Sequence, residues 1–551
     1  MTFASFYDWI LSTFSSFYAW ILSKFEEIRL DTSSWYLLAS ATFFLLWLLL
    51  RGLYRVMTAK WSSISFFILK HAVYPHLLPR TSFTGTATRF HIAVTTLYLL
   101  VNVLFVTIPK ATWADMGTRA ATMSVINLIP LLCGPRLTMV TNLLGISLRT
   151  SLASHKWFGR TAIGLAGFHI AIIAKNGERI ARTWSGVSGV VASSAFGLIF
   201  VLSIRPVIRR LYEWFLNSHV VLAAVALLAI WRHLPTKTAA AKFLNIGMCQ
   251  WAIMSAVHWG LFARRNFVFG RPFGSATVTP LQTTTVRNRS SDQSEESQVL
   301  QIDITVPRPW RVCAGQHVFL SIPGLGIFTG LRGHPFVIAW WDRDRGGLTI
   351  SVLATSKNGF TRKLGRHPNR AFRAFIDGPF GIPHDFGEYG TVIMIATGIG
   401  IAGHMPYLKD LVSGYNSCEV RTRRILLVWR IQNEDHEDAV RPWIVKPWMD
   451  KILEQDTGMS GKEDEDLGTH EKIKLTSAPP DIEGLLAKEI GGRRGDIMVS
   501  LCADNAIADR ARMQVQTHMD KGVRLVELDF QPPSFKAAAK DTRGMEFSCR
   551  G

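Results

Sequence analysis

Four histidines lie in two apolar stretches of the chain with the same spacing. HKWFGRTAIGLAGFH runs from His155 to His169, and HVVLAAVALLAIWRH runs from His219 to His233. On a helix, 14 residues end about 40° short of four full turns and rise about 21 Å, so the two histidines of each stretch share one face at two depths. We expect each stretch to carry one imidazole near each side of a membrane.

These imidazoles are suited to binding iron. Ionisable side chains inside a membrane span are costly and usually functional, and a haem iron accepts two axial imidazole ligands. One span separates the two stretches, so they run in the same direction, and their first histidines can meet at one depth and their second histidines at another. The pattern predicts two stacked bis-histidine haem sites. Zinc would need three or four protein ligands in one cluster, and we interpret His91 and His258 as interfacial or packing residues.

Seven long apolar runs supply the elements that must position these side chains. Each is close to the roughly 20 residues that cross a bilayer as a helix. The runs are residues 35–53, 90–109, 119–134, 157–174, 184–204, 215–231 and 243–262. Lys and Arg clusters at alternate span ends favour an external N-terminus and a cytosolic second half. Ahead of the spans, residues 1–34 contain the repeat SFYDWILSTF and SFYAWILSKF, which indicates an interfacial amphipathic segment, with a partner-binding helix as the alternative.

Charge and cysteine usage exclude other classes of protein. The net charge of +20 lies largely beside the apolar runs, where anionic lipid is the nearer partner, and no nucleic-acid-binding motif is present. The six cysteines are scattered and form no CxxC pair, so neither an iron–sulfur site built on that motif nor a disulfide framework is expected. After about residue 275 the apolar runs give way to short β-rich segments.

The first half resembles a known family in two segments. IPLLCGPRLTMVTNLLGISLRTSLASHKWFGRTAIGLAGFH and SIRPVIRRLYEWFLNSH resemble the ferric reductase transmembrane domain, which fungal ferric-chelate reductases and NADPH oxidases share. The resemblance extends over about residues 85–535. It implies that His155 pairs with His219 near the cytosol and that His169 pairs with His233 near the outside, each pair holding a b-type haem.

Several cytosolic segments resemble the flavin site of that family. HPFVIA resembles the strand that lies against the isoalloxazine ring of FAD, although the family commonly has threonine where Val337 stands. KNGFTRKL resembles the segment that holds the flavin pyrophosphate, and DGPFG follows it. The resemblance assigns cofactor binding to His334, Pro335, Phe336, Val337, Lys357, Gly359, Thr361, Arg362, Gly378 and Pro379.

The last part predicts a nucleotide-binding domain. TVIMIATGIGIAGHMPYL reads as a buried strand, a glycine turn and a helix, which presents backbone amides to phosphate. It resembles the turn of a ferredoxin reductase-like NADPH domain, with Thr397 in place of the first glycine and with Gly398 and Gly400 retained. Cys502 resembles the cysteine near the nicotinamide, in Cys-Ala-Asp instead of Cys-Gly-Pro. Phe535 resembles the aromatic that covers the flavin, and 16 further residues follow it.

We therefore expect a multi-domain fold: an α-helical transmembrane bundle, then a β-barrel FAD domain and an α/β NADPH-binding domain. The expected boundaries are 1–34, 35–270, 271–385 and 386–551. The resemblance implies a plasma-membrane, NADPH-dependent ferric-chelate reductase that passes electrons through FAD and two haems to an external ferric chelate or siderophore. It leaves a copper or iron transport partner unidentified.

Three alternatives stay open. They are an NADPH oxidase that makes superoxide, a reductase of a siderophore or organic substrate, and a non-catalytic haem membrane protein or transporter. Val337, Thr397 and Ala503, where the chain departs from the family pattern, are the residues that keep the last two open.

Overall fold

The computed structural model divides the chain into two compact units. Residues 80–133 and 153–253 belong to the first unit, and residues 67–79, 134–152 and 254–551 to the second. The structure describes residues 67–78, 87–108, 112–133, 142, 145–177, 183–281, 298–326, 332–344, 347–356, 359–431, 436, 439–440, 442–443, 464–466, 471–476, 481–492, 495–528, 530 and 543–550. The predicted amphipathic segment, the predicted span 35–53, Lys357 and Phe535 lie outside these residues.

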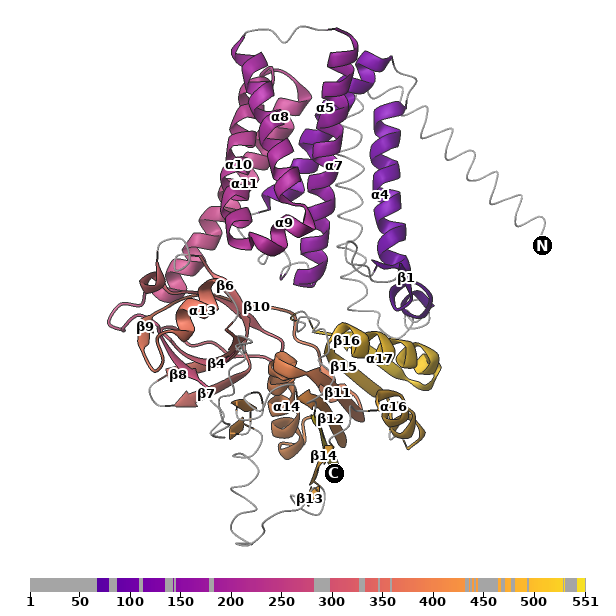
Figure 1. Cartoon of the computed structure of the whole chain (residues 1–551), viewed down its shortest axis with the longest axis vertical. Coiled ribbons are helices and arrows are strands. Elements are labelled where there is room, and N and C mark those ends of the chain that lie inside the picture. The colour runs from indigo at the N-terminus through magenta and orange to yellow at the C-terminus, as the bar shows by residue number, and fades with distance from the viewer. Residues whose placement is uncertain are drawn as a thin grey trace, which may run out of the picture. The chain divides into compact units, whose positions relative to one another are not determined.

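Helices make up the first unit, after the two-residue strand β2 (Ala87–Thr88) (Figure 1). Six predicted spans coincide with helices, which confirms them as helical. They are α4 (Arg89–Thr107), α5 (Trp113–Leu128) with the 3₁₀ turn η2 (Ile129–Leu132), α7 (Leu148–Lys175), α8 (Trp184–Leu202), α10 (Tyr212–His233) and α11 (Ala239–Asn266), with the short helix α9 (Arg205–Arg210) before α10. Among the described residues, α4, α7, α8 and α10 are long and apolar enough to cross a membrane.

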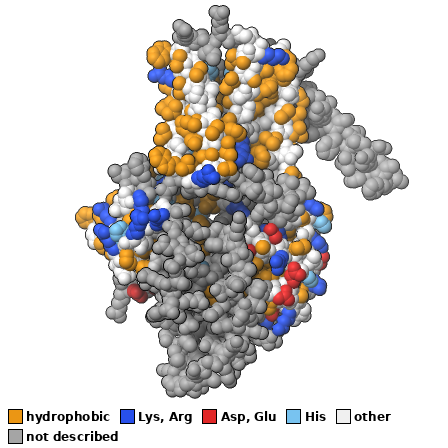
Figure 2. All heavy atoms as spheres, in the orientation of Figure 1, with side chains coloured by type: hydrophobic (Ala, Val, Ile, Leu, Met, Phe, Trp, Pro, Cys, Tyr) orange, Lys and Arg blue, Asp and Glu red, His pale blue; other side chains and the backbone are white. Residues whose placement is uncertain are grey.

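Local sequence starts three of these helices. The hydroxyl groups of Thr88, Thr112 and Thr183 each accept a hydrogen bond from a backbone N–H of the first turn. The Asp115 carboxylate also accepts the backbone N–H of Thr112, which completes a capping box. The outward faces carry hydrophobic side chains (Figure 2), which suits contact with lipid. Inside the unit, Asn127 Nδ2 donates to Asn102 Oδ1 at 2.7 Å and Ser124 Oγ donates to the Ala162 carbonyl at 2.7 Å. These buried polar groups are thus paired across helices.

The second unit begins its described part with the π-helical turn η1 (Leu69–Val73) and β1 (His76–Leu78), and then contains two antiparallel sheets. The larger has the order β7-β8-β4-β3-β9: β7 (Trp340–Asp344), β8 (Gly347–Thr355), β4 (Val299–Val306), β3 (Ser275–Pro280) and β9 (Ala371–Arg373). The smaller has the order β10-β5-β6: β10 (Phe375–Phe380), β5 (His317–Ser321) and β6 (His334–Val337). Short connections are η3 (Pro323–Leu325), α13 (Gly359–Gly365) and η4 (Phe386–Glu388). The strands are antiparallel as predicted, but they form two sheets around one apolar core, and a closed barrel is not shown among the described residues.

A seven-stranded sheet forms the rest of the second unit, in the order β13-β14-β17-β12-β11-β15-β16. Its parallel part consists of β12 (Arg424–Ile431), β11 (Thr391–Thr397), β15 (Ile497–Cys502) and β16 (Val523–Glu527). The turn η5 (Gly398–Gly400) with α14 (Ile401–Asn416), then α16 (Ile482–Gly491), α17 (Asn505–His518) and η6 (Met519–Lys521) connect the strands. The strand–turn–helix predictions are confirmed.

The residues beyond Phe535 add a strand that sequence reasoning did not predict. β17 (Arg543–Arg550) lies between β14 (Glu471–Thr476) and β12 and pairs antiparallel with both, while β13 (Asp464–Asp466) pairs with β14. A strand in this place satisfies backbone groups along the edge of β12 that would otherwise be open. The end of the described chain is therefore part of the sheet.

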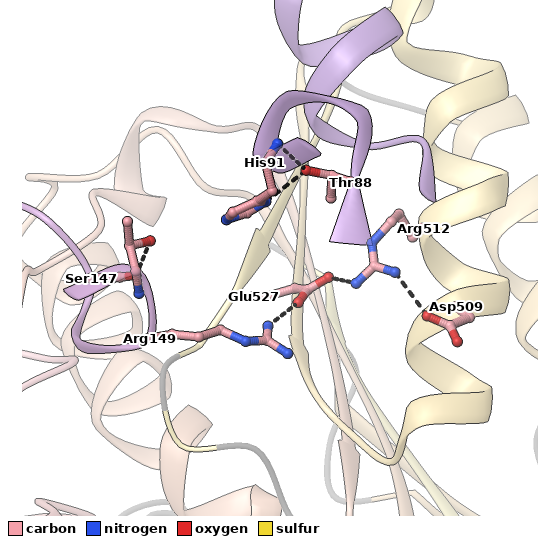
Figure 3. A network of polar contacts seen from close by, with 8 residues as sticks. Thr88, His91, Ser147, Arg149, Asp509, Arg512 and Glu527 are labelled. Carbon is pink, nitrogen blue, oxygen red and sulfur yellow. Dashed lines mark hydrogen bonds and ion pairs between the residues drawn. The ribbon is translucent and has the colours of Figure 1, made fainter. Parts of the chain in front are cut away.

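An ion-pair network joins the start of α7 to the edge strand β16 (Figure 3). Arg149 Nη1 donates to Glu527 Oε2 at 2.8 Å, Arg512 donates to the other oxygen of Glu527, and Arg512 also donates to Asp509 Oδ1 at 2.8 Å. Glu527, at the end of β16, thus bridges two guanidinium groups, one on α7 and one on α17.

Candidate functional site

The structure brings the first histidine of each predicted pair together. His155 on α7 and His219 on α10 face each other with ring centroids 6.0 Å apart and an interplanar angle of 66°. Two imidazoles on one metal ion need about 2 Å for each metal–nitrogen bond and about 1 Å from each nitrogen to its ring centre, a separation of about 6 Å. His155 Nδ1 is buried and makes no hydrogen bond to any residue that the structure describes. The two rings therefore fit the axial positions of one haem iron.

The second histidine of each pair is oriented by a backbone carbonyl. His169 Nδ1 lies 3.0 Å from the carbonyl oxygen of Gly117, and His233 Nδ1 lies 2.9 Å from that of Ser185. A carbonyl oxygen can only accept, so Nδ1 of each ring carries the proton and Nε2 keeps its lone pair. This is the arrangement that metal-binding histidines use to fix the tautomer and direction of the ring. Both residues therefore fit axial ligation through Nε2.

Space for the His233 ring depends on a glycine of the neighbouring helix. A Cβ atom on Gly189 of α8 would lie 2.8 Å from His233 Nδ1 and 2.9 Å from its Cε1. Real Cβ atoms do not approach other atoms so closely. Sequence reasoning missed Gly189, because its role depends on the packing of α8 against α10.

The predicted flavin residues lie in two segments that meet through stacked rings. His334 at the start of β6 stacks on Phe360 of α13, with ring centroids 4.0 Å apart and an interplanar angle of 18°. Phe336 lies 6.1 Å from the same ring. Around Phe360, Gly359 adopts a φ of +59°, while Thr361 is half-buried and Arg362 is exposed. On β6 itself, Pro335 is exposed and Val337 is half-buried.

A buried histidine that sequence reasoning missed lies beside this strand. His317 on β5 is 2% exposed, and neither of its ring nitrogens has a hydrogen-bond partner among the described residues. It is in register with Val337 on one side and Phe380 on the other, and its ring lies 5.0 Å from that of Phe530. Burial lowers the pKa of His317 to about 4. The sequence signal is a polar residue at a buried position of the strand HVFLS.

Gly378 and Pro379 lie on β10, at the other edge of the three-stranded sheet from β6. Both line a cavity of about 440 Å³ whose lining residues include none of the β6 strand. Adjacent strands are about 4.8 Å apart, so β10 and β6 are separated by about 10 Å. The structure does not bring these two residues together with His334.

The predicted nucleotide-site residues converge at the carboxyl ends of β11 and β15. Thr397 is fully buried, and its hydroxyl oxygen accepts the backbone N–H of Asp504 at 2.7 Å. The carboxylate of Asp504 in turn accepts the amides of Ala506 and Ile507 and so caps α17. The two departures from the family pattern, Thr397 and Cys-Ala-Asp, thus bond to each other. Next to Thr397, Gly398 has a φ of +49° and its carbonyl accepts the Trp429 indole N–H at 2.9 Å, and Gly400 is buried at the end of the same turn.

Cys502 lies at the end of β15 and is 1% exposed. Burial raises its pKa to about 12, so the group is a neutral thiol at physiological pH. The thiol donates to the carbonyl oxygen of Phe530 at 3.0 Å, and a Cβ on Gly403 of α14 would lie 3.2 Å from Sγ. Cys502 is therefore linked through Phe530 to the ring of His317, which connects the predicted nicotinamide side to the predicted flavin side.

Comparison with known proteins assigns two segments of the chain. Residues 120–230 match the ferric reductase like transmembrane component family, and residues 285–384 match an FAD-binding domain family. The chain is 24% identical over 343 residues to ferric/cupric reductase transmembrane component 1 of Candida albicans, a match that covers 59% of this chain and 40% of that protein. It is 24% identical over 312 residues to ferric/cupric reductase transmembrane component 2 of Saccharomyces cerevisiae, covering 54% and 40%.

A solved ferredoxin-NADP+ reductase from Plasmodium falciparum is similar with a TM-score of 0.28 and 12% identity, over 48% of this chain and 98% of that one. The chain spans less than half the length of the first two reductase components.

The helical unit with its histidine pairs, followed by a matched flavin-binding domain and a mixed α/β sheet, is the arrangement of a membrane protein with a flavin-binding domain. Over these segments the chain is similar to ferric/cupric reductase transmembrane components.

Proposed function

We propose that this protein transfers electrons from cytosolic NADPH, by way of FAD and two b-type haems, to a ferric chelate outside the plasma membrane. The observation that carries the proposal is the set of four histidines on α7 and α10. One pair has the ring separation that a shared iron requires, and in the other pair both Nδ1 atoms are bound to backbone carbonyls. The matches to a ferric reductase like transmembrane component and to an FAD-binding domain support flavin-dependent electron transfer across a membrane.

Different groups of residues would bind the haems, the flavin and the nucleotide. His155 and His219 would hold one haem, and His169 and His233 the other, with Gly117 and Ser185 fixing the outer rings. The segments around His334 and Phe360 would bind the flavin, and the turn at Thr397, Gly398 and Gly400 would bind nucleotide phosphate. When bound, the flavin would supply two-electron exchange with the nucleotide, and the haems would supply one-electron exchange. The protein supplies position, exclusion of water and the electrostatic surroundings.

The decisive experiment is an absorption spectrum of purified membranes under nitrogen, before and after NADPH, combined with a product assay. We expect reduced bis-histidine b-type haem after NADPH and Fe(II) trapped by a chelator. Haem that is reduced by dithionite but never by NADPH would contradict the proposal and favour a non-catalytic haem protein. Cytochrome c reduction that superoxide dismutase abolishes, without Fe(II), would instead identify oxygen as the acceptor.

We further propose that the imidazole of His317, which has no hydrogen-bond partner among the described residues, contacts the flavin and supplies the polar group that Val337 cannot. His317→Phe keeps an aromatic ring at a site already lined by aromatic side chains but removes both nitrogens. We expect weaker retention of FAD and a shifted flavin reduction potential, measured by flavin fluorescence and spectroelectrochemistry. Phe319→Leu, a change to a half-buried neighbour on the same strand, is the control. Unchanged FAD affinity and potential in His317→Phe would refute this role.

A further inference from the structure

A cavity of about 440 Å³ lies in the second unit, between the last turns of α11 and the edge strand β10. It is lined by Asn142, His258, Leu261, Phe262, Arg264, Arg265, Arg308, Pro309, Trp310, Asp377, Gly378, Pro379 and Phe380. Side-chain contacts hold its walls together. Asn266 Nδ2 donates to the Ile376 carbonyl at 2.7 Å, and the Ile376 amide donates back to Asn266 Oδ1 at 2.7 Å. Asn142 Oδ1 accepts the Gly381 amide at 2.9 Å.

The cavity carries an excess of positive charge. Three of its lining residues are arginines, Arg264, Arg265 and Arg308, and none of them forms an ion pair with a carboxylate that the structure describes. Arg265 donates to the carbonyl oxygen of Arg308 at 3.2 Å and lies 4.5 Å from the Trp310 ring centroid. The acidic residue of the lining, Asp377, is 5% exposed and lies 3.4 Å from His258 Nε2. An anion would therefore find guanidinium donors that no described carboxylate occupies.

Aromatic side chains indicate the depth of this cavity in the membrane. Trp259 on α11 is 57% exposed, and Phe267 and Phe273, just beyond the helix, are 53% and 42% exposed. Exposed aromatic side chains at the end of a membrane span, here the predicted span 243–262, are typical of the headgroup level of a bilayer. Leu261 and Phe262 add an apolar wall beside the arginines. The arginines suit a phosphate group and the apolar wall suits a hydrocarbon chain, and a phospholipid contains both.

We propose that this cavity binds the phosphate of an anionic phospholipid, with Arg264, Arg265 and Arg308 as donors. Basic pockets at the ends of membrane helices bind anionic headgroups in this way. The cavity lining includes Gly378 and Pro379 of the predicted flavin residues but none of β6, which lies at the opposite edge of the three-stranded sheet from β10. The proposal does not depend on electron transfer.

The test uses the full-length chain, reconstituted in phosphatidylcholine nanodiscs with or without phosphatidic acid, and native mass spectrometry to count bound lipid. We expect phosphatidic acid to remain bound and to raise the melting temperature, and inorganic phosphate at the same concentration to do neither. In Arg264→Gln and Arg308→Gln we expect binding about tenfold weaker, as for the loss of one charge-assisted contact. Arg370→Gln, an exposed arginine on the same unit that does not line the cavity, is the control.

Two results would overturn the proposal. Equal phosphatidic acid binding in Arg264→Gln, Arg308→Gln and the wild type would show that the lipid binds elsewhere. Stabilisation by inorganic phosphate that equals stabilisation by phosphatidic acid would show that the site takes free phosphate and not lipid. Both readouts are independent of NADPH oxidation, so a failure here is distinguishable from a failure of the proposed function.

Discussion

Individual histidines in this protein differ in what surrounds their ring nitrogens. His169 and His233 each use Nδ1 to bond a backbone carbonyl, whereas the Nδ1 of His155 is buried without a described partner. His404, fully buried on α14, bonds the Ile395 carbonyl through Nε2 at 3.1 Å. The first three suit ligation, and the last is structural. Histidine content alone does not distinguish these roles, but the partners of each nitrogen do.

A substitution at Gly189 tests whether His169 and His233 bind the outer haem. In Gly189→Ala the new methyl group would lie 2.8 Å from His233 Nδ1, so the ring must leave its position. We expect haem content, measured as the pyridine haemochrome, to fall from two per chain toward one. Gly197→Ala on the same helix, where a Cβ meets nothing within 4 Å, should keep the wild-type value. Full haem content in Gly189→Ala would count against ligation by His233.

The burial of His404 leads us to predict that the protein becomes less stable as the pH falls. Burial lowers its pKa in the folded state from 6.5 to about 4, and the bond to Ile395 only partly offsets this. Below pH 6.5 the unfolded chain takes up a proton that the folded chain refuses, so stability falls as pH drops from 6.5 toward 4, by about 3 kcal/mol in total. His317 contributes in the same direction. In His404→Gln the melting temperature should depend less steeply on pH in this window; an unchanged slope would refute the assignment.

At the scale of elements, the ends of the parallel strands carry the predicted nucleotide site. β11 and β15 are parallel neighbours in register from Thr391 to Ala396, so the residues that follow both strands meet at one edge. The bond between Thr397 and the Asp504 amide ties the glycine turn of η5 to the start of α17. Thr397 therefore stabilises the turn in which it stands in place of the first glycine of the family pattern.

Thr397→Val should separate this hydrogen bond from the packing of the side chain. The substitution keeps the shape and leaves the Asp504 amide without its acceptor, which costs about 1–3 kcal/mol. We expect a lower melting temperature, measured by thermal denaturation of the purified chain. Thr391→Val on the same strand is the matched control, because the buried Thr391 hydroxyl has no partner among the described residues. It should be neutral or stabilising, and equal losses in both variants would refute the role of the bond.

At the scale of the whole molecule, the helix α11 is bonded at its last residue to the sheet strand β10. It is 28 residues long, and its last turns belong to the same compact unit as β10. Asn266 is 1% exposed and exchanges two hydrogen bonds with the backbone of Ile376, as a neighbouring strand would. The amide side chain thereby fixes the end of the helix to the strand that leads into Asp377 and Gly378.

Asn266→Ala removes both bonds and leaves the buried N–H and C=O of Ile376 without partners. We expect a loss of stability of about 2 kcal/mol or more, since each unsatisfied buried group costs about 1–3 kcal/mol. Hydrogen exchange at the amides of β10 should also rise. Asn245→Ala, an exposed asparagine on the same helix, is the control. Unchanged protection of β10 in Asn266→Ala would show that other contacts hold this strand.

The sequence by itself determined the features that depend on local periodicity. The equal spacing of His155–His169 and His219–His233, the apolar runs and the strand–turn–helix around Thr397 are set by residues close together along the chain, and all of the described ones formed the predicted elements. Val337 and the Cys-Ala-Asp turn were also visible as departures from the family pattern.

Only the tertiary structure decided which distant residues meet. The approach of His155 to His219, the burial of His317 among Phe380 and Phe530, and the insertion of β17 beside β12 join segments tens to hundreds of residues apart. No local pattern encodes such contacts, because burial and the pairing of polar groups depend on all the elements that pack around a position. For the same reason Gly189, Asn266 and the arginine-lined cavity could not be read from the chain, since their roles come from neighbours on other elements.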